Sequence, residues 1–209
     1  MLADLTVTDF LDRVSSNDPV PGGGSVAALA GALASALGTM VARLTIGKKR
    51  YEVSEEIMQH ALTLTTKFQE EFIILIDKDS EAYDQVFACF RLPQATDGEK
   101  EIRNTAIQQA TRRATLVPME VARKSLEMIF VIADIARLGN QNAITDACVA
   151  MMSARTAVCG ALMNVRINLS SLIDKELVLQ LQSEADHIQK TAFLKEKELL
   201  DAVNQDLRV

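Results

Sequence analysis

The segment from Val26 to Ala42 carries no charged side chain, and it constrains the fold more than any other part of the chain. Most of its residues are Ala, Gly and Ser, which allow neighbouring helices to approach closely. Because the segment is short for a bilayer and rich in small residues, we expect a buried central helix and no membrane span. Large apolar residues recur at helical spacings of three and four; they are Val26, Leu29, Leu33, Leu37, Met40 and Leu44.

Helical periodicity fills most of the remaining sequence, with only short breaks. Thr96 and Glu99 form a capping box at one helix start, whereas Pro118 should kink or break the same helix. No β-type alternation, repeat or linker interrupts the pattern, so we expect one all-α domain over residues 1–209, an up-and-down helical bundle with long helices. The expected helices cover residues 6–15, 25–46, 54–91, 96–138, 145–169 and 174–204.

The formal net charge of −6 argues against a general nucleic-acid-binding protein, which would present a basic face. The three cysteines, Cys89, Cys148 and Cys159, show no metal-ligand or redox spacing. We interpret them as reduced, buried thiols in a reducing compartment and therefore expect a cytoplasmic protein. The N-terminus lacks the basic region of a signal peptide, and no His-rich motif predicts a metal site.

Three consecutive glycines, Gly22, Gly23 and Gly24, precede Ser25 and the uncharged helix. Such a run favours unusual dihedral angles or the close approach of a ligand. The free amides at the helix start would suit an anion or a carbonyl oxygen. The alternative is a flexible turn in which Ser25 caps the helix.

One acidic residue, Asp79, lies within an apolar stripe of the helix expected over residues 54–91. A carboxylate on an apolar face must be hydrogen-bonded, paired or protonated, and burial raises its pKa. Such a group can serve as a general acid or base; the alternative is a structural, buried salt bridge. The apolar residues of the stripe are Phe68, Phe72, Ile76, Tyr83, Val86 and Phe90.

Polar residues also gather at the start of the helix expected over residues 145–169. Asn140, Asn142 and Asp146 stand close together, and capping explains only part of this cluster. Further along, an Ala stripe on the same helix reaches Asn164 and Asn168. Two amides that continue an Ala face indicate either a polar pocket wall or a hydrogen bond that bridges helices.

A basic group, Lys48, Lys49 and Arg50, follows the uncharged helix. Cations are favoured at a helix C-terminus by the helix dipole, which is the structural interpretation of this group. The functional interpretation is a clamp for a ligand carboxylate.

Together these polar sets resemble the cyclodeaminase/cyclohydrolase family. The family includes the C-terminal domain of formiminotransferase-cyclodeaminase and stand-alone bacterial methenyltetrahydrofolate cyclohydrolases. The matching stretches keep their order and spacing over nearly the whole chain; they are residues 21–28, 47–51, 79–83, 139–147 and 164–169.

The resemblance implies an all-helical, dimeric enzyme with a folate substrate, no tightly bound cofactor and no metal. An excess of apolar helical faces also predicts a homodimer. Asp79 is the first candidate for the acid/base and Asp146 the second. The implied substrate-binding residues are Gly22, Gly23, Gly24 and Ser25 through their amides, Lys48 and Lys49 on the glutamate tail, Tyr83, and Asn140, Asn142 and Asn164 on the pterin or carbon unit.

The resemblance leaves two reactions open. The first is formiminotetrahydrofolate cyclodeaminase, in which N10 attacks the formimino carbon on N5 and ammonia leaves. The alternative is methenyltetrahydrofolate cyclohydrolase, in which water adds to the carbon between N5 and N10 and the ring opens. A non-catalytic helical dimerisation module is the alternative from another class, and it requires no special role for the polar sets.

Overall fold

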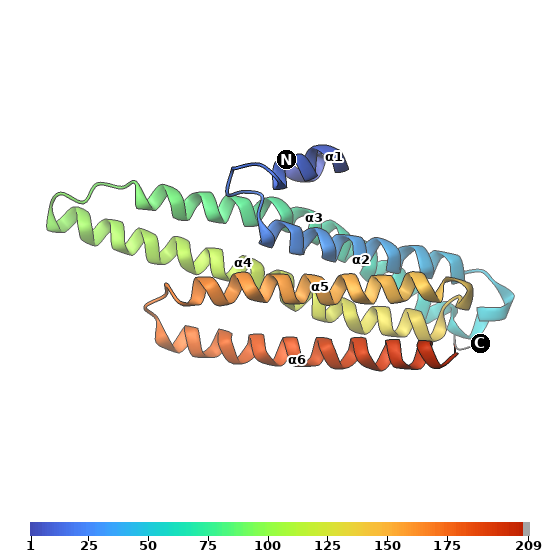
Figure 1. The fold of residues 1–209 in the computed structure, drawn as a ribbon. Coiled ribbons are helices and arrows are strands. Elements are labelled where there is room, and N and C mark those ends of the chain that lie inside the picture. The colour runs from blue at the N-terminus through green and yellow to red at the C-terminus, as the bar shows by residue number, and fades with distance from the viewer. Residues whose placement is uncertain (207–209) are drawn as a thin grey trace.

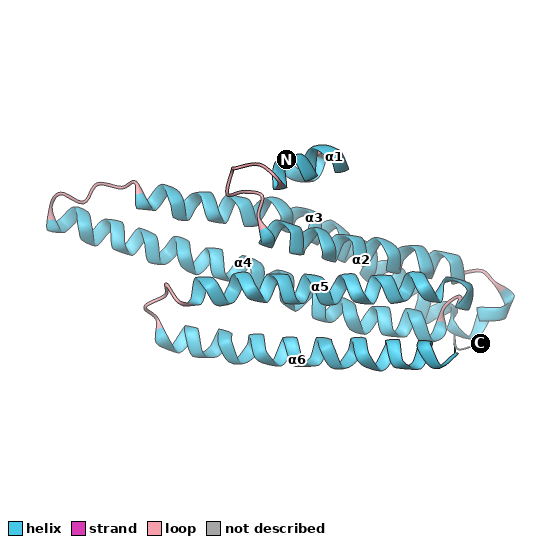
Figure 2. Ribbon diagram, viewed as in Figure 1, coloured by secondary structure: helices cyan, strands magenta, loops and turns pink. Residues whose placement is uncertain are grey.

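The computed structural model describes residues 1–206, and regular structure within them is entirely helical (Figure 1, Figure 2). The long helices alternate in direction along one axis, so the predicted all-α, up-and-down bundle is confirmed. The helices are α1 (Val7–Val14), α2 (Gly23–Thr45), α3 (Glu55–Phe90), α4 (Asp97–Leu138), α5 (Ile144–Leu169) and α6 (Lys175–Asp206), with short 3₁₀ helices η1 (Leu2–Asp4), η2 (Lys49–Ser54) and η3 (Gln141–Ala143).

Helix α2 packs against α3, α4 and α5 through its small residues rather than through its large ones. Its buried positions are almost all Gly, Ala, Ser or Thr, with Val41 as the largest. The large apolar residues lie on the outward side, where Leu33 is 54% exposed. The expected buried central helix is therefore buried on its inner side only.

The approach of α2 to α3 is close enough to require glycine. A Cβ atom at Gly31 would lie 2.7–2.9 Å from the ring of Phe72, which is fully buried. Further along the same contact, the hydroxyl of Thr39 donates a hydrogen bond to the hydroxyl of Thr65 at 2.8 Å. The small residues of α2 thus set the distance between the two helices.

Helix α4 begins with the predicted capping box of Thr96 and Glu99 but continues unbroken through Pro118. The predicted break is wrong, and a hydrogen bond from α5 gives the reason. Proline has no amide N–H, so the carbonyl of Ala114, four residues earlier, has no partner within its helix. The side-chain amide of Asn168 donates to that carbonyl at 2.8 Å, and this contact satisfies it.

The end of α3 and the start of α4 form a hairpin that projects beyond the other helices (Figure 1). The predicted apolar stripe of α3 is therefore only partly buried: Phe72 and Ile76 are in the core, whereas Tyr83 is 42% and Phe90 is 52% exposed. The sequence pattern identified the stripe correctly, but it could not show where the partner helices end.

Two helical segments, Gly23–Thr45 and Gln141–Leu169, are long and apolar enough to cross a membrane by length and composition alone. In the bundle, 61% and 50% of their most apolar windows are buried by neighbouring helices. Core helices of folded domains pass the same test, and the packing matches the expectation drawn from the small residues of α2.

All three cysteines are free, but only Cys148 is buried as expected. Cys89 and Cys159 are half-buried, so the prediction of three buried thiols is wrong for these two. Cys89 belongs to the projecting end of α3, where few helices cover the chain.

We expect Gly31→Ala to lower the free energy of unfolding by about 1–3 kcal/mol, because the new methyl group must displace the buried ring of Phe72. Chemical denaturation measures the change. Gly98→Ala is the control, since a Cβ at Gly98 meets no other atom within 4 Å. Equal stability of the two variants would contradict the packing described for α2 and α3.

Candidate active site

A cavity of about 330 Å³ lies where the N-terminus of α2 meets α3, α4 and α5. It brings together six residues that the sequence predicted from three separate segments. These six are Gly22, Gly23, Gly24, Asp79, Tyr83 and Asn164. The remaining lining residues are Pro19, Val20, Val86, Ala114, Ile167 and Asn168.

The backbone amides of Gly23, Gly24 and Ser25 form the first turn of α2. The first hydrogen bond within the helix runs from the amide of Val26 to the carbonyl of Gly22, at 3.1 Å. The three preceding N–H groups therefore have no partner inside the helix, and the positive end of its dipole faces the cavity.

The close approach predicted from the glycine run is present, and the group that approaches is Asp79. A Cβ atom at Gly24 would overlap the carboxylate of Asp79 on α3. Gly24 is thus required because any larger residue would occupy the position of this side chain. At Gly23, by contrast, a Cβ would lie 3.4 Å from Nδ2 of Asn164, which is ordinary contact.

Ser25 links α2 to α3 beside the carboxylate. Its hydroxyl lies 2.8 Å from the carbonyl oxygen of Ile76, 3.3 Å from Oδ2 of Asp79 and 3.1 Å from Oγ of Ser80. Gly22, rather than Ser25, stands at the N-cap position of α2. The interpretation of Ser25 as a helix cap is therefore wrong, because its side chain binds the neighbouring helix.

Burial raises the pKa of Asp79 above the usual value for an aspartate, and hydrogen bonds from the hydroxyl and backbone of Ser25 offset part of this effect. Within residues 1–206 no Lys, Arg or His side chain forms an ion pair with Asp79, so the alternative of a structural salt bridge is wrong for the described chain. A desolvated carboxylate without a cationic partner, open to a cavity, can exchange a proton with a bound molecule.

The other predicted residues lie at the opposite end of the bundle and are called the far set; they are Lys48, Lys49, Asn140, Asn142 and Asp146. Lys48 and Lys49 are exposed beyond the C-terminus of α2, about 33 Å from the glycine run at 1.5 Å per helical residue. Asn142 is exposed and Asp146 half-buried at the start of α5, near that same end. A single chain therefore does not bring this set to the cavity that contains Asp79.

Asn140 is the most constrained residue of the far set. Its backbone amide donates to the hydroxyl of Thr45 at 2.8 Å, and its side-chain amide donates to the carbonyl of Leu44 at 3.2 Å. Its Oδ1 accepts from the amide of Asn142 at 3.2 Å and from the hydroxyl of Tyr51 at 3.4 Å. The contact with Asn142 makes Asn140 the N-cap of η3, as the capping interpretation predicted. The contacts with Thr45 and Leu44 tie the end of α2 to the turn before α5.

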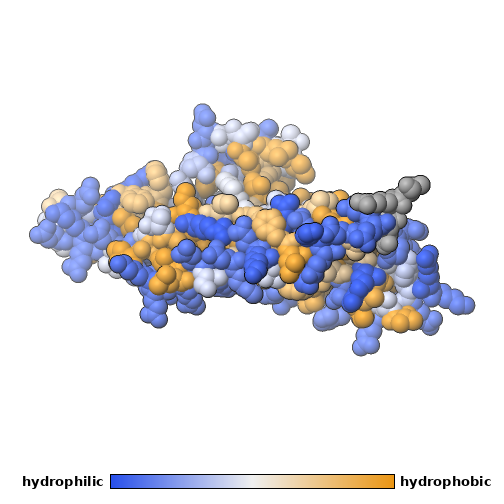
Figure 3. Space-filling view, turned by 60° about the horizontal axis from the view of Figure 1, so that its bottom comes forward, coloured by the Kyte–Doolittle hydropathy of each residue, from blue (hydrophilic) through white to orange (hydrophobic). Residues whose placement is uncertain are grey.

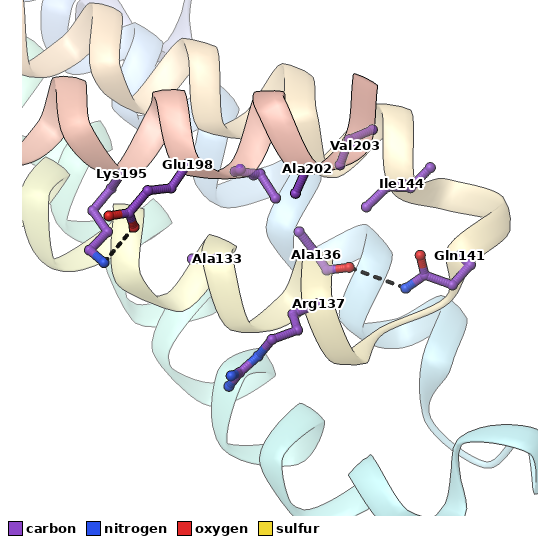
Figure 4. Close-up of a pocket in the computed structure, with 10 residues that line it drawn as sticks. Ala133, Ala136, Arg137, Gln141, Ile144, Lys195, Glu198, Ala202 and Val203 are labelled. Atoms are coloured by element: carbon purple, nitrogen blue, oxygen red, sulfur yellow. Dashed lines mark hydrogen bonds and ion pairs between the residues drawn. The ribbon is translucent and has the colours of Figure 1, made fainter. Parts of the chain in front are cut away.

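A larger hollow, of about 400 Å³, lies between α6 and the adjoining ends of α4 and α5 (Figure 4). Its polar side chains are already paired: Lys195 bonds Glu198 at 2.7 Å, and Gln141 donates to the carbonyl of Ala136 at 3.2 Å. Its other walls are mostly aliphatic. We therefore place the site at the smaller cavity, where a half-buried carboxylate remains available.

Asn168 also lines the cavity, although the sequence indicates only that it continues the Ala stripe of α5. The hydrogen bond from Asn168 to Ala114 could have been anticipated only by relating Pro118 to a distant helix.

No group of three or more His, Cys, Asp or Glu residues that could hold a metal ion occurs in the described part of the chain.

The helical fold and the desolvated carboxylate at a helix N-terminus define a class of protein with an acid/base site in a small-molecule cavity. A family model described as formiminotransferase-cyclodeaminase matches residues 6–187. The chain belongs to this family.

Relatives of known name support this membership. The chain is 39% identical over 175 residues to methenyltetrahydrofolate cyclohydrolase of Methylorubrum extorquens, which covers 84% of each protein. It is 31% identical over 173 residues to formimidoyltransferase-cyclodeaminase of Rattus norvegicus, covering 83% of this chain and 32% of that protein. The chain therefore spans about a third of the length of that two-function relative.

A solved structure has the same fold over the whole chain. The crystal structure of formiminotetrahydrofolate cyclodeaminase from Thermotoga maritima superposes with a TM-score of 0.84 and 28% sequence identity. The match covers 97% of this chain and 99% of that one. The fold is thus shared by a protein of nearly the same length.

We expect Gly24→Ala to reduce turnover by about 10²-fold, because a displacement of roughly 1 Å in a reacting group has an effect of that size. The new methyl group would overlap the carboxylate of Asp79 and push it from its position. Steady-state kinetics with a reduced folate substrate measures the effect. Gly98→Ala is the control, because a Cβ at Gly98 meets no other atom within 4 Å and Gly98 does not line the cavity. Equal activity of both variants would show that the Gly24 contact is unimportant.

Proposed function

We propose that this protein is a tetrahydrofolate one-carbon enzyme that acts on the carbon held at N5 and N10. Formiminotetrahydrofolate cyclodeaminase is the first activity, and methenyltetrahydrofolate cyclohydrolase is the second. The observation that carries the proposal is the carboxylate of Asp79, which is desolvated, free of ion pairs within residues 1–206 and open to a cavity beside helix N-terminal amides.

In the cyclodeaminase reaction, N10 attacks the formimino carbon that is bonded to N5. The attack forms the C–N10 bond, and N10 gives its proton to the carboxylate of Asp79. The protonated side chain then gives that proton to the departing nitrogen, and the C–N bond breaks to release ammonia. A single carboxyl group with a raised pKa can perform both transfers, and such transfers contribute about 10²–10⁴ in rate.

In the cyclohydrolase reaction, water adds to the methenyl carbon between N5 and N10. Asp79 accepts one proton from this water and returns it to N5 as the C–N5 bond breaks. The remaining hydroxyl proton is released to solvent as the C=O bond forms, which leaves the formyl group on N10. The observation that favours this reaction is the 39% identity to a stand-alone cyclohydrolase over 84% of each chain.

Both substrates carry an N–C–N unit with positive charge, and the site suits such a group. The ionised carboxylate of Asp79 attracts the cation, whereas the free amides of Gly23 and Gly24 can bind a carbonyl oxygen elsewhere on the pterin. Asn164, whose Nδ2 donates to the carbonyl of Gly160 at 2.9 Å, presents its oxygen as a further acceptor.

Two absorbance assays distinguish the activities. Formation of methenyltetrahydrofolate from the formimino compound indicates the cyclodeaminase, and its enzyme-dependent loss in water indicates the cyclohydrolase. Absence of both activities, with no binding of any reduced folate, would favour the non-catalytic dimerisation module.

A cytoplasmic location is proposed as well, because the three free thiols suit a reducing compartment.

We expect Asp79→Asn to lower turnover by about 10²–10⁴ while the melting temperature stays the same or rises. The amide keeps the shape of the side chain but cannot exchange the proton. It also removes the cost of burying a charge, because the raised pKa of Asp79 means that its ionised form is disfavoured in the folded protein. Turnover and thermal melting near neutral pH measure both effects.

The matched control is Asp84→Asn, since Asp84 lies on the same helix and is exposed. It should leave turnover and melting unchanged. In the active protein, kcat/KM should fall as the pH drops through the raised pKa of Asp79, because only the ionised carboxylate accepts the proton. Near-normal turnover of Asp79→Asn would move the acid/base role to Asp146.

The homodimer remains part of this proposal, and an uncovered apolar surface supports it. The accessible surface of 11785 Å² exceeds the about 9,600 Å² that a compact monomer of this size exposes. On the face that carries α6, hydrophobic and hydrophilic residues alternate without an apolar band (Figure 3). The outward sides of the neighbouring helices α2 and α5 expose Val26, Leu33, Met40, Leu44, Val149, Met152, Met163 and Ile167.

This α2–α5 apolar surface is the proposed contact between two copies. A second protomer is also the way in which the far set, with Lys48, Lys49 and Asp146, could meet the substrate. The two ends of one α2 helix are about 33 Å apart, so only another copy can bring the far set to the cavity.

We expect Leu33→Glu to convert the dimer to a monomer, because a charge would be buried within the α2–α5 apolar surface. Light scattering at micromolar concentration measures the mass. Leu179→Glu is the control: Leu179 is 69% exposed on α6, outside the α2–α5 apolar surface, and its replacement should leave the mass unchanged. A wild-type protein that is monomeric under these conditions would contradict the dimer.

A further inference from the structure

Pro118 leaves one backbone carbonyl of α4 without a helical partner, and this carbonyl lies at the wall of the cavity. Proline cannot donate to the carbonyl of Ala114, and Ala114 lines the cavity. The side chain of Asn168, on α5, supplies the missing donor at 2.8 Å. A carbonyl oxygen only accepts hydrogen bonds, so this contact fixes which end of the carboxamide faces it.

The orientation has a consequence for the other end of the same side chain. With Nδ2 held on Ala114, the Oδ1 atom of Asn168 must point away from that carbonyl, and Asn168 also lines the cavity. Within the described part of the chain, no protein group donates a hydrogen bond to this oxygen. A half-buried acceptor with a fixed direction and no protein donor is suited to bind a ligand N–H.

A similar arrangement occurs one turn earlier on α5. The Nδ2 atom of Asn164 donates to the carbonyl of Gly160, which leaves its Oδ1 as an acceptor too. The first turn of α2, with the free amides of Gly23 and Gly24, supplies donors to the same cavity. The cavity therefore combines acceptors on α5 with donors on α2, and a ligand must match both.

We propose that Asn168 is a substrate-binding residue whose Oδ1 accepts a hydrogen bond from a ring N–H of the reduced pterin. Pro118 removes the helical donor to the carbonyl of Ala114, so this carbonyl depends on the amide of Asn168 for its hydrogen bond. The proposal rests on the folate activity proposed above. A reduced pterin suits the cavity since its ring carries N–H donors for the two asparagines and a carbonyl for the α2 amides.

A purely structural role for Asn168 would give a different pattern in a double-variant experiment. In Pro118→Ala, the new amide of residue 118 can bond the carbonyl of Ala114, which then no longer depends on Asn168. The second lone pair of this carbonyl can still accept from the amide of Asn168 and keep its orientation. Asn168→Ala in this background therefore removes only the acceptor that faces the cavity. In the wild-type background, Asn168→Ala removes that acceptor and also leaves the carbonyl of Ala114 unpaired.

The dissociation constant is measured by titration with 5-formyltetrahydrofolate, a stable reduced folate, and thermal melting is followed in parallel. We expect Asn168→Ala to weaken binding about tenfold, from the loss of one hydrogen bond, and to lower the melting temperature. In the Pro118→Ala background we expect the loss of melting temperature to disappear and the tenfold loss of binding to remain. With substrate, KM should rise and kcat should change little.

Equal affinity of Pro118→Ala and of the double variant would overturn the proposal and leave Asn168 as a structural cap. Failure of the wild-type protein to bind any reduced folate would instead overturn the folate activity and this proposal together. If Pro118→Ala does not fold, Asn168→Asp replaces it: it keeps an acceptor but cannot donate to Ala114. Binding within about threefold of wild type supports the proposal, and a loss equal to that of Asn168→Ala contradicts it.

Discussion

The close contact between the small inner side of α2 and α3 is the constraint on which the rest of the structure depends. It places the ring of Phe72 against Gly31 and, two turns earlier on α2, the carboxylate of Asp79 against Gly24. A wider spacing would admit water to the carboxylate and lower the cost of its charge. The same packing that forms the core therefore also raises the pKa of the residue to which the chemistry is assigned.

The sequence predicted the helical class and most helix boundaries, and it singled out residues near the glycine run that share one cavity. These features are predictable because helical periodicity, the capping box at Thr96 and an acidic residue, Asp79, within an apolar stripe are all local signals in the sequence. The outward direction of Leu33 and the exposure of Tyr83 could not be predicted. They depend on where neighbouring helices lie and end, which the periodicity of a single helix does not record.

Two expectations depend on contacts that are distant in sequence. Pro118 predicts a kink or break in α4, but the helix is unbroken because Asn168, far along the chain, satisfies the carbonyl that proline exposes. Asn140 and Asn164 are predicted to share one site, yet within one chain α5 separates them to opposite ends of the bundle. The residue types indicated which positions are polar. The packing and length of the helices determine which of these polar residues contact each other.

The hydroxyl of Ser25 has one hydrogen and three oxygen neighbours, on Ile76, Asp79 and Ser80. When Asp79 is ionised, that hydrogen is best used on the carboxylate; when Asp79 carries its own proton, the hydroxyl can turn to the carbonyl of Ile76. Each transfer of a proton at Asp79 can thus be accompanied by rotation about a single C–O bond. The charge at this position can change without movement of either helix, so a rigidly packed bundle can still cycle between two electrostatic states.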